Sequence, residues 1–460
     1  SGLSGPREGG VSSPSRLREG PGVGMRDFGK SDDPRVQAQL DRLGELSLPQ
    51  GRLGLEAIRA LMERLGNPHR KLPPVFHVAG TNGKGSTCAF LRAMLEAQGC
   101  KVHVTTSPHL VRYNERIRLA GELISDAMLA DVLEEVLDAG EDLGPSFFEV
   151  TIAAAFLAFA RVPADACVVE VGMGGRFDAT NVLEPEVLAA CGIAALGLDH
   201  ERFLLAPEEG TPPEPLARIA FEKAGIAKPG VPLVSIARPL LEAQSIAAVA
   251  RAKGAPLFVQ GEDWHAAPFD GGLGYSDRTG RDGVDGINLA PPALPGAHQF
   301  QNAALAIAML RHQHRLPVRF DAFSLGLQAA RWPARMQRLS AGPLTGRRAV
   351  WLDGGHNPQA GAMIGAHFAG QRLHLVIGMI DGKDPASLTG PLGESLASIT
   401  AVPVPGHDWH PAEAFGPEAR PAPDVSGALA MIPDDGLPVL IAGSLYLAGQ
   451  VLRLNDELPD

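Results

Sequence analysis

A glycine-rich segment between an apolar strand and a helix constrains this chain more than any other feature. Val75–Ala79 is an apolar run typical of a buried strand, residues 80–86 are Gly-Thr-Asn-Gly-Lys-Gly-Ser, and helical periodicity follows. In such a unit the loop N–H groups and the helix N-terminus bind phosphates, and Lys84 adds a positive charge. The spacing departs from G-x-x-x-x-G-K-[ST], since Gly80 lies two residues too close and Gly85 follows the lysine. A plain glycine turn is the alternative, but strand, lysine and helix together favour a nucleotide-phosphate site.

The composition is that of an ordinary globular protein. At 460 residues, with 45% hydrophobic and 20% charged residues, two or three domains are expected. The net charge of −11 argues against a nucleic-acid surface, which needs a basic stripe. The cysteines have neither disulfide-framework nor metal-site spacing, and no apolar run reaches the roughly 18–20 residues of a membrane span. We therefore expect a cytoplasmic protein with small-molecule partners, no nucleic acid and no membrane.

Short apolar runs alternate with helical patterns and predict an α/β fold. The first strand-like runs are Val75–Ala79, Lys101–Thr105, Ala166–Val171 and Val187–Ile193. This alternation is typical of a doubly wound, mainly parallel sheet, so we expect a P-loop-containing domain over residues 25–330. Residues 1–24 are rich in Ser, Gly, Pro and Arg, which predicts a disordered extension or a tag remnant ahead of Met25.

A second series after Trp332 predicts a smaller Rossmann-like α/β domain over residues 331–460. Its strand-like runs are Arg348–Leu352, Leu373–Gly378, Ile399–Pro403 and Leu437–Ala442, and its expected helices span residues 358–369 and 385–396. Between the two series, Leu233–Asn288 has weak periodicity and two glycine clusters, 271–274 and 280–286, that indicate hairpin turns. Ligands tend to bind between domains and at the carboxyl ends of strands, so we expect the two domains to share one site.

The phosphate loop resembles that of the Mur ligase superfamily, and its Lys-Gly-Ser order is similar to the folylpolyglutamate synthase/dihydrofolate synthase branch. Mur ligases usually have threonine directly after the lysine. Further strings carry the resemblance in the family's order: Thr106–Leu110, Tyr113–Ile117, Glu170–Asn181, Gly197–His200, Phe221–Ile226, Trp332–Arg335, Asp353–Pro358 and Gly443–Leu447. The resemblance implies an ATP-dependent ligase that joins L-glutamate to the carboxylate of dihydropteroate, of tetrahydrofolate, or of both, through an acyl phosphate.

Glu170 ends an apolar strand and precedes a glycine-rich turn. A carboxylate there either binds Mg²⁺ beside the phosphate loop or caps the turn, and spacing alone favours neither. The resemblance implies that Glu170, Ser107 and His200 are Mg²⁺ ligands; alone, the serine indicates only a turn and the histidine a surface or core position. It also implies that Lys223 is carbamylated and is an oxygen ligand of a second Mg²⁺, whereas an exposed helix lysine is the ordinary expectation.

The resemblance assigns further residues to ATP and to catalysis. The expected ATP-binding residues are Asn82, Gly83, Lys84, Gly85, Ser86, Asn302 (adenine), Arg335 (phosphates) and Asp353 (ribose or phosphate). The expected catalytic residues are Lys84, Glu170, His200, Lys223 and His356. Asn302 is otherwise a helix-surface amide, and Asp353 and His356 could instead cap a helix that begins at Pro358. Gly355 stands where the family usually has alanine.

The two acceptor sites are also implied by the resemblance. The pteroate or folate pocket matches Leu53, Gly54, Leu55, Phe147, Phe148, Glu149 and Asp178. The glutamate site matches Arg116, His356 and Ser444. Arg52 stands where the family commonly has aspartate, and core packing is the alternative for both phenylalanines. Arg116 has the chemistry to bind a carboxylate, although Arg118 is a near neighbour.

Other function classes are less consistent with these residues. A Mur-type peptidoglycan ligase is disfavoured by the Lys-Gly-Ser order at residues 84–86. A non-catalytic P-loop nucleotide switch needs neither the Glu170, His200 and Lys223 set nor a second nucleotide-contacting domain. Whether one or both synthase activities are present stays open, although the pocket residues and the compact length suggest both. We expect a monomer.

Overall fold

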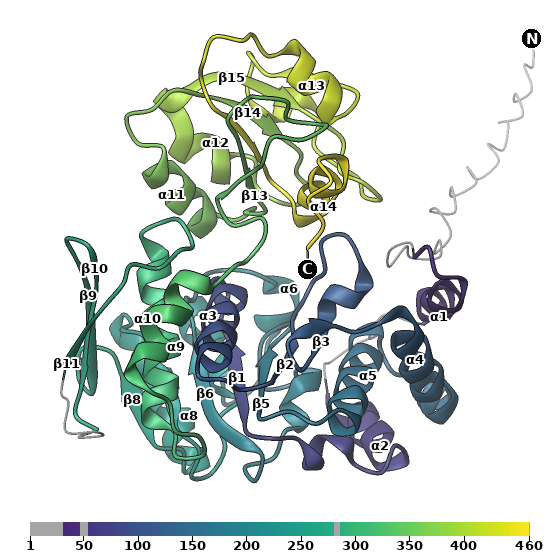
Figure 1. Cartoon of the computed structure of the whole chain (residues 1–460), viewed down its shortest axis with the longest axis vertical. Helices are drawn as coiled ribbons and strands as arrows, with labels where there is room; N and C mark the ends of the chain where they lie inside the picture. Colours follow the sequence, from purple (N-terminus) through teal and green to yellow (C-terminus); the bar gives the residue numbers. More distant parts are fainter. Residues whose placement is uncertain (1–30, 47–53, 280–285, 460) are drawn as a thin grey trace, which may run out of the picture.

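The structure, a computed structural model, describes residues 31–46, 54–279 and 286–459. Two α/β domains follow one another along the chain, the P-loop domain in the lower part of Figure 1 and the C-terminal domain in the upper part. The predictions for residues 1–24 and for Leu53 lie outside the described residues. Within those residues, no helix combines the length and the apolar character that crossing a membrane requires.

The P-loop domain alternates strands with helices, as predicted. Its strands are β1 (Val75–Ala79), β2 (Val102–Thr105), β3 (Ile117–Leu119), β4 (Glu122–Leu123), β5 (Ala166–Glu170), β6 (Leu188–Ile193), β7 (Leu233–Ser235), β8 (Leu257–Val259), β9 (Trp264–Phe269), β10 (Gly272–Asp277) and β11 (Gly286–Leu289). Its helices are α1 (Pro34–Glu45), α2 (Glu56–Arg64), α3 (Lys84–Ala97), α4 (Asp126–Gly140), α5 (Phe147–Arg161), α6 (Glu201–Leu204), α7 (Pro215–Ala224), α8 (Leu240–Lys253), α9 (His298–His312) and α10 (Phe320–Ala329).

The main sheet of this domain has the strand order β4-β3-β2-β5-β1-β6-β7-β8. Every neighbouring pair from β2 to β8 is parallel, whereas β3 and β4 extend the β2 edge in antiparallel fashion. Strands β9, β10 and β11 form a separate antiparallel sheet at the side of the domain (Figure 1). The predicted doubly wound, mainly parallel sheet is confirmed.

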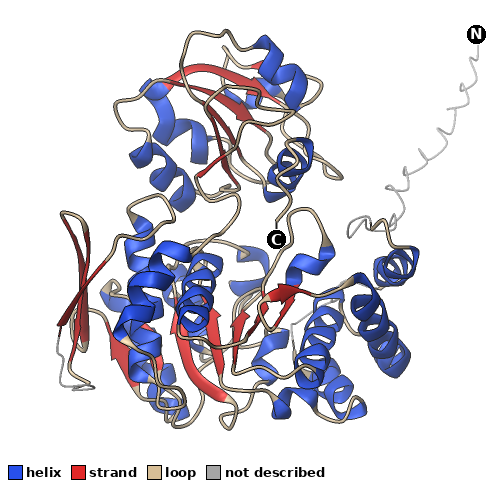
Figure 2. Ribbon diagram, viewed as in Figure 1, coloured by secondary structure: helices blue, strands red, loops and turns tan. Residues whose placement is uncertain are grey.

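Helices cover both faces of the main sheet (Figure 2). Successive side chains of a strand point to opposite faces, so alternate residues of β1 belong to different cores. Val75 and Ala79 pack in a core with α2, α4, α5, α7 and α8, while Phe76 and Val78 pack in a core with α3, α9 and α10. Burial on both faces explains why the central strands are apolar along their length.

The C-terminal domain repeats this design on a smaller scale. Its strands are β12 (Gln337–Arg338), β13 (Val350–Asp353), β14 (Leu373–Ile377), β15 (Leu396–Ala401), β16 (Arg420–Pro421) and β17 (Val439–Ala442). Its helices are α11 (Pro358–His367), α12 (Ala386–Leu392), α13 (Val425–Met431) and α14 (Leu445–Leu454). The sheet order is β12-β13-β17-β14-β15-β16, parallel except at β12. One core packs against α13 and α14, and the other against α11 and α12.

The structure corrects the prediction of one long helix over residues 385–396. Helix α12 ends at Leu392, a single 3₁₀ turn follows, and β15 already begins at Leu396. Pro391 lies in the last turn of α12 and offers no N–H to continue a helical ladder, while Gly393 takes φ +21°. Local backbone chemistry therefore ends this helix earlier than the periodicity suggested.

The weakly periodic region Leu233–Asn288 contains regular structure that the pattern did not predict. Helix α8 buries Glu242 and Ser245 together with Ile246 and Val249, so its apolar stripe is interrupted by polar residues. Strands β9 and β10 form a hairpin, so a turn is confirmed at Gly271, whereas residues 272–274 of the same glycine cluster belong to β10. The second glycine cluster, 280–286, lies almost entirely outside the described residues.

Candidate active site

The phosphate loop joins the carboxyl end of β1 to the N-terminus of α3. Gly83 takes φ +80°, in the left-handed region that favours glycine, and a Cβ there would collide with the Asn302 amide. Gly85 lies against the indole ring of Trp332. A Cβ added at Gly85 would come closer to that ring than van der Waals contact allows. Gly83 thus lets the loop pack closely against α9, and Gly85 of the unusual Lys-Gly-Ser order lets it pack against the segment between the domains.

Side chains of α9 are tied to this loop. Gln299 donates to the Ser86 hydroxyl at 3.3 Å and accepts from the Asn302 amide at 3.0 Å. Asn302 is buried, which excludes the alternative of a helix-surface amide. Lys84 is the first residue of α3, and its ammonium donates to the Thr81 carbonyl at 3.4 Å. The lysine is thus held at the helix N-terminus, where the backbone N–H groups of α3 are also directed.

Glu170 lies beside the loop because it ends β5, which pairs with β1. Val78 and Glu170 are partners in the sheet register. The buried carboxylate accepts the Ser107 N–H at 3.1 Å. Burial raises the pKa of Glu170, and the positive charges of Lys84 and Arg335 oppose that rise. The carboxylate therefore lies within the electrostatic reach of the phosphate loop and of the interdomain segment.

Lys223 is buried, so the alternative of a solvent-exposed helix lysine is excluded. Its ammonium donates to the Gly80 carbonyl at 2.9 Å, which links α7 to the first residue of the phosphate loop. Burial is the main cause that lowers the pKa of Lys223 to about 7, and the charge of Lys84 adds to it. A large fraction of this amine is consequently neutral and nucleophilic near pH 7.

His200 occupies the segment that follows β6, at the same edge of the sheet. It takes φ +52° and precedes α6, and its imidazole is 47% exposed. Burial of the surrounding site lowers the pKa of His200 and the neighbouring lysines add to this, whereas Asp199 opposes the shift. Asp199 in turn forms a 3.1 Å ion pair with Lys383 of the C-terminal domain.

Asp199 and Lys383 were not identified from the sequence. Lys383 lies in the polar turn Asp381–Asp384, which follows β14 at the carboxyl edge of the second sheet. The position of Lys383 after a parallel strand could have identified it from the sequence, because ligand-binding residues of parallel sheets gather at the carboxyl ends of strands. The pairing itself joins residues 184 positions apart and leaves no local pattern.

Asp353 and His356 lie at the carboxyl end of β13, where the C-terminal domain meets the interdomain segment. Asp353 accepts the N–H groups of Met336 at 2.8 Å and Gly355 at 2.7 Å. Burial raises the pKa of Asp353, and the charge of Arg335 opposes the rise. Burial lowers the pKa of His356, whose Nδ1 lies 3.0 Å from the Gly354 carbonyl oxygen. Neither residue caps α11.

Helix α11 is capped by Asn357, which also contacts the phosphate loop. Its Oδ1 accepts the Ala360 N–H at 2.9 Å, and its Nδ2 donates to the Asn82 side chain at 3.2 Å. Asn82 donates in turn to Gln359 at 2.5 Å. The phosphate loop of one domain is therefore hydrogen-bonded directly to the first turn of a helix in the other.

Arg116 is buried at the end of the 3₁₀ turn Tyr113–Arg116, directly before β3. Its guanidinium lies 5.4 Å from the Tyr113 ring centroid and 5.1 Å from that of Phe147, and its Nε donates to His109 at 2.8 Å. Burial lowers the pKa of Arg116. Ser444 caps α14 by accepting the Tyr446 N–H at 3.1 Å. Arg118, in contrast, donates to the Gly121 carbonyl in the β3–β4 turn.

The residues matched to a pteroate pocket are largely engaged within the protein. Glu149 forms a capping box at the start of α5, with its carboxylate 2.7 Å from the Ser146 nitrogen. Asp178 accepts the Met173 N–H at 2.8 Å and the Thr180 hydroxyl at 2.5 Å. The Phe148 ring packs against Gly172, where no Cβ would fit. Leu55 is a buried residue at the start of α2, next to Gly54.

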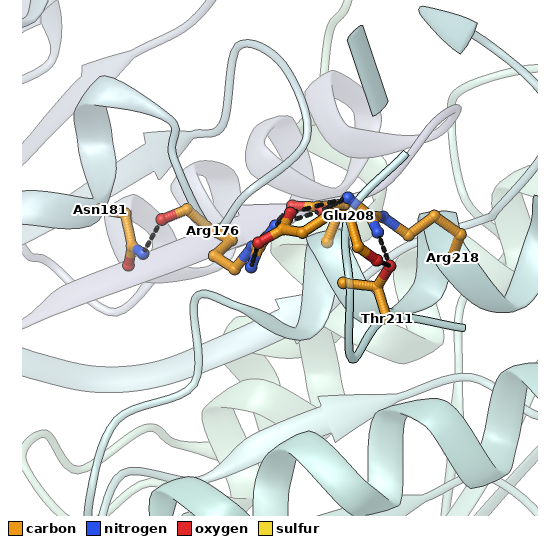
Figure 3. Close-up of polar contacts among 6 residues, drawn as sticks. Arg176, Asn181, Glu208, Thr211 and Arg218 are labelled. Atoms are coloured by element: carbon orange, nitrogen blue, oxygen red, sulfur yellow. Dashed lines mark hydrogen bonds and ion pairs between the residues drawn. The ribbon is translucent and has the colours of Figure 1, made fainter. Parts of the chain in front are cut away.

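A network of charged side chains fixes α7 and the glycine-rich turn that precedes Asp178 (Figure 3). Arg176 pairs with Glu208 at 2.5 Å and with Glu222 at 2.8 Å, and Arg218 pairs with the same carboxylates at 3.0 Å each. Arg218 also donates to Thr211. Because Glu222 immediately precedes Lys223, this network determines where the Lys223 ammonium lies.

A cleft of about 1610 Å³ runs between α3, the interdomain segment and α14. Ser107, Glu170 and Arg335 line it. Throughout the described part of the chain, no three His, Cys, Asp or Glu side chains gather closely enough to bind a metal ion. Among the metal ligands expected from the sequence, Glu170 and His200 belong to these four residue types, whereas Ser107 and Lys223 do not.

Comparison with known proteins identifies relatives over most of the chain. No family model matches it. The dihydrofolate synthase/folylpolyglutamate synthase of Bacillus subtilis is 32% identical over 441 residues, which cover 87% of this chain and 94% of that protein. The protein of the same name from Escherichia coli is 35% identical over 374 residues, 80% of each chain. The dihydrofolate synthetase of Saccharomyces cerevisiae is 30% identical over 441 residues, 88% of this chain and 98% of the relative.

Solved structures match both domains together. Escherichia coli FolC in complex with DHPP and ADP aligns with a TM-score of 0.80 at 31% identity, covering 92% of this chain and 97% of that one. The bifunctional folylpolyglutamate synthase/dihydrofolate synthase of Yersinia pestis complexed with AMPPNP and Mn ion aligns with a TM-score of 0.77 at 31% identity, covering 91% and 97%.

Replacement of Arg218 by methionine tests the charged network around α7. The change removes Arg218 as an ion-pair partner of the buried Glu222 and of the half-buried Glu208, so we expect the free energy of unfolding to fall by about 2–4 kcal/mol in urea titrations. Arg35→Met, which breaks the exposed Arg35–Asp131 pair, is the control and should shift the midpoint little. Equal effects of the two changes would contradict a stabilising role for the network.

Proposed function

This chain belongs to the dihydrofolate synthase/folylpolyglutamate synthase family of the Mur ligase superfamily, and on that premise we propose that it is an ATP-dependent ligase of folate metabolism. The proposed reaction joins the amine of L-glutamate to the carboxylate of dihydropteroate, of a tetrahydrofolate, or of both. ATP activates the carboxylate and Mg²⁺ assists. The proposed form is a cytoplasmic monomer.

One observation supports this proposal most: three elements bring Lys84, Glu170 and Lys223 to the same edge of one sheet. Glu170 is paired with Val78 in the sheet, and the Lys223 ammonium is 2.9 Å from the Gly80 carbonyl. The charge of Lys84 acts on both of the other groups. A phosphate loop, a buried carboxylate and a buried amine at one edge provide what a phosphoryl-transfer site needs, which is mainly positioning and charge stabilisation.

The C-terminal domain supplies the remaining groups. Lys383 pairs with Asp199, while Asn357 bonds to Asn82 of the phosphate loop. His356 lies on the turn between β13 and α11, with a pKa lowered by burial. A neutral imidazole there is able to accept the proton that the glutamate amine loses as it attacks. Domain contact of this kind also excludes water, which would hydrolyse an acyl phosphate.

The residues present fit a divalent cation that is held partly by the substrate. Glu170 offers a buried carboxylate at the end of β5, while Ser107 offers a hydroxyl and His200 an imidazole on the segments that follow β2 and β6. Mg²⁺ commonly uses one or two protein ligands together with phosphate oxygens and water, so a closed protein cage is not required. Bound there, Mg²⁺ would neutralise charge on the phosphates.

The chemistry requires activation because a carboxylate is a poor electrophile. Lys84 and the N-terminus of α3 would hold the γ-phosphoryl group while the substrate carboxylate attacks it, which gives an acyl phosphate and ADP. Arg335 lies within the charge environment of Glu170 and Asp353 and would bind phosphate oxygens from the opposite side. Attack by the glutamate amine then forms the amide and releases phosphate.

We assign the incoming L-glutamate to Arg116, His356 and Ser444, and the pteroate or folate group to Gly54, Leu55, Phe147, Phe148, Glu149 and Asp178. Arg116 supports the first assignment because it is a buried guanidinium near α14, whose Gly449 packs against the Leu110 carbonyl. Phosphate release with ATP and glutamate, with either dihydropteroate or a tetrahydrofolate as acceptor, tests the function. No release with either acceptor would contradict it, and release with only one would show a monofunctional enzyme.

We further propose that Lys223 is carbamylated. The neutral amine adds to CO₂, its nitrogen–carbon bond forms, and the nitrogen loses a proton, so an ammonium becomes an anionic carbamate. A pKa of about 7 makes the neutral amine abundant, and the positive charge of Lys84 would stabilise the anion formed. The carbamate would offer oxygen ligands at a position where unmodified Lys223 would carry a positive charge.

Lys84→Ala should abolish turnover because Lys84 supplies the positive charge at the phosphate loop. We expect acceptor-dependent phosphate release to fall about 100-fold or more, with an unchanged unfolding midpoint. Lys101→Ala, which removes an exposed lysine of the same domain, is the control. Near-normal turnover in folded Lys84→Ala protein would rule out the assignment of the loop.

Glu170→Gln and His200→Ala should both raise the Mg²⁺ concentration needed for residual activity. Loss of one ligand in such a site typically weakens the metal about tenfold or more. Half-maximal Mg²⁺ is measured at saturating ATP, with the exposed Glu134→Gln as control. An unchanged Mg²⁺ dependence would show that Glu170 and His200 have structural roles and are not metal ligands.

Lys223→Ala should lose most activity and also a carbamate signal. We expect wild-type protein in ¹³C-bicarbonate to show a carbamate resonance in NMR spectra that grows as pH rises through about 7, since the neutral amine then predominates. Lys253→Ala, which removes another partly buried lysine, should keep the resonance. Activity lost in CO₂-depleted buffer at mildly acid pH should return with bicarbonate; if it does not, the carbamate assignment is wrong.

A further inference from the structure

A second cavity, of about 480 Å³, lies at the opposite edge of the P-loop domain sheet. Its lining includes Arg59 on α2 and residues that precede β1, β6 and β7, among them His69, Glu184 and Lys228. These strands are mutually parallel, so the segments leading into them share the amino edge, whereas the phosphate loop follows β1 at the carboxyl edge. Figure 1 accordingly shows α2 at the end of the domain farthest from the C-terminal domain. The cavity is separate from the candidate active site.

Three cationic side chains line this cavity, Arg59, Arg70 and Lys228, together with two carboxylates, Glu63 and Glu184. Arg70 pairs with Glu184 at 2.8 Å, which neutralises both. The Lys228 ammonium donates to the Asn181 carbonyl at 3.0 Å, and within the described residues neither Lys228 nor Arg59 forms an ion pair with a carboxylate. Burial and the nearby positive charges of Lys253 and Arg59 lower the pKa of Lys228 to about 8. An anion in the cavity would relieve this repulsion.

Two buried polar atoms at the cavity have no hydrogen-bond partner in the described structure. They are His69 Nδ1 and Asn181 Oδ1, on residues that are 5% and 4% exposed. The orientation of the Asn181 amide is fixed, because its Nδ2 donates to the carbonyls of Arg176 at 2.9 Å and Gly225 at 3.2 Å. Its Oδ1 is therefore an acceptor in need of a donor. Buried polar atoms are rarely left unpaired, because each lost hydrogen bond costs stability.

We propose that this cavity binds a small organic anion whose phosphate or carboxylate group lies between Arg59 and Lys228 and whose hydroxyl or amino group donates to Asn181 Oδ1. Its volume falls in the range of small-molecule sites. Charge-assisted hydrogen bonds to an arginine and a lysine are the strong contacts that such a site requires. The proposal does not depend on the ligase function.

Calorimetric titration of the full chain with inorganic phosphate and with malate tests the site. Both probes carry an anionic group and a hydroxyl donor, and they distinguish a phosphate ligand from a carboxylate one. The titrations are run with saturating ADP, so that the phosphate loop is already occupied. We expect saturable binding to one site by at least one probe, with a Kd of about 1 mM or tighter.

Variants at the cavity complete the test. Arg59→Gln and Lys228→Met should each weaken that binding about tenfold. Arg251→Gln removes an exposed positive charge of α8 that does not line the cavity and should leave the Kd within about twofold. Arg59 is exposed, so its variant retains the fold even if the lysine variant does not. Absence of saturable binding in the presence of ADP, or binding unaffected by Arg59→Gln, would overturn the proposal.

Discussion

Parallel pairing of β1 with β5 on one side and β6 on the other is the constraint on which the candidate site depends. In this register Val78 is opposite Glu170 and also opposite Gly192, so the segments that follow all three strands emerge together. The phosphate loop, the Glu170 carboxylate and the Asp199–His200 segment then meet at one edge, where the Thr81 hydroxyl of the loop exchanges hydrogen bonds with the Gly197 backbone. Strand sterics and hydrogen bonding thus position the chemistry before a substrate arrives.

At this edge of the sheet, the charged groups of the protein are balanced by one another rather than by solvent. Burial raises the pKa of Glu170 and lowers that of Lys223, so both groups are displaced toward their neutral forms. The opposing charges of Lys84 and Arg335 keep the carboxylate from shifting further. Such groups respond strongly to a bound polyanion, because few water molecules screen them. The network around Arg176 and Arg218 holds α7 in place, and with it the amine of Lys223.

The C-terminal domain contributes through a small number of polar contacts. Lys383 pairs with Asp199, and Asn357 and Gln359 bond to Asn82, so the second domain touches the two segments that surround the phosphate loop. Polar contacts of this kind are weaker than a packed hydrophobic core and allow the domains to open at the site, while Val111 of the P-loop domain, buried in a core of the C-terminal domain, keeps the two domains joined. A ligase that must admit three substrates and then exclude water has a use for both properties.

The sequence by itself determined the doubly wound fold and the phosphate loop, because glycine sterics and hydrophobic periodicity act over a few neighbouring residues. The other candidate residues were implied by the resemblance to a known family and not by those local patterns. It left α8 unrecognised and extended α12 too far, since interrupted burial and Pro391 act against those patterns. Only the tertiary structure decided that Lys223 is buried against Gly80, that Lys383 pairs with Asp199, and that an anion-compatible cavity lies at the amino edge of the sheet. Burial and charge pairing depend on residues brought together from more than a hundred positions apart, and no local pattern records them.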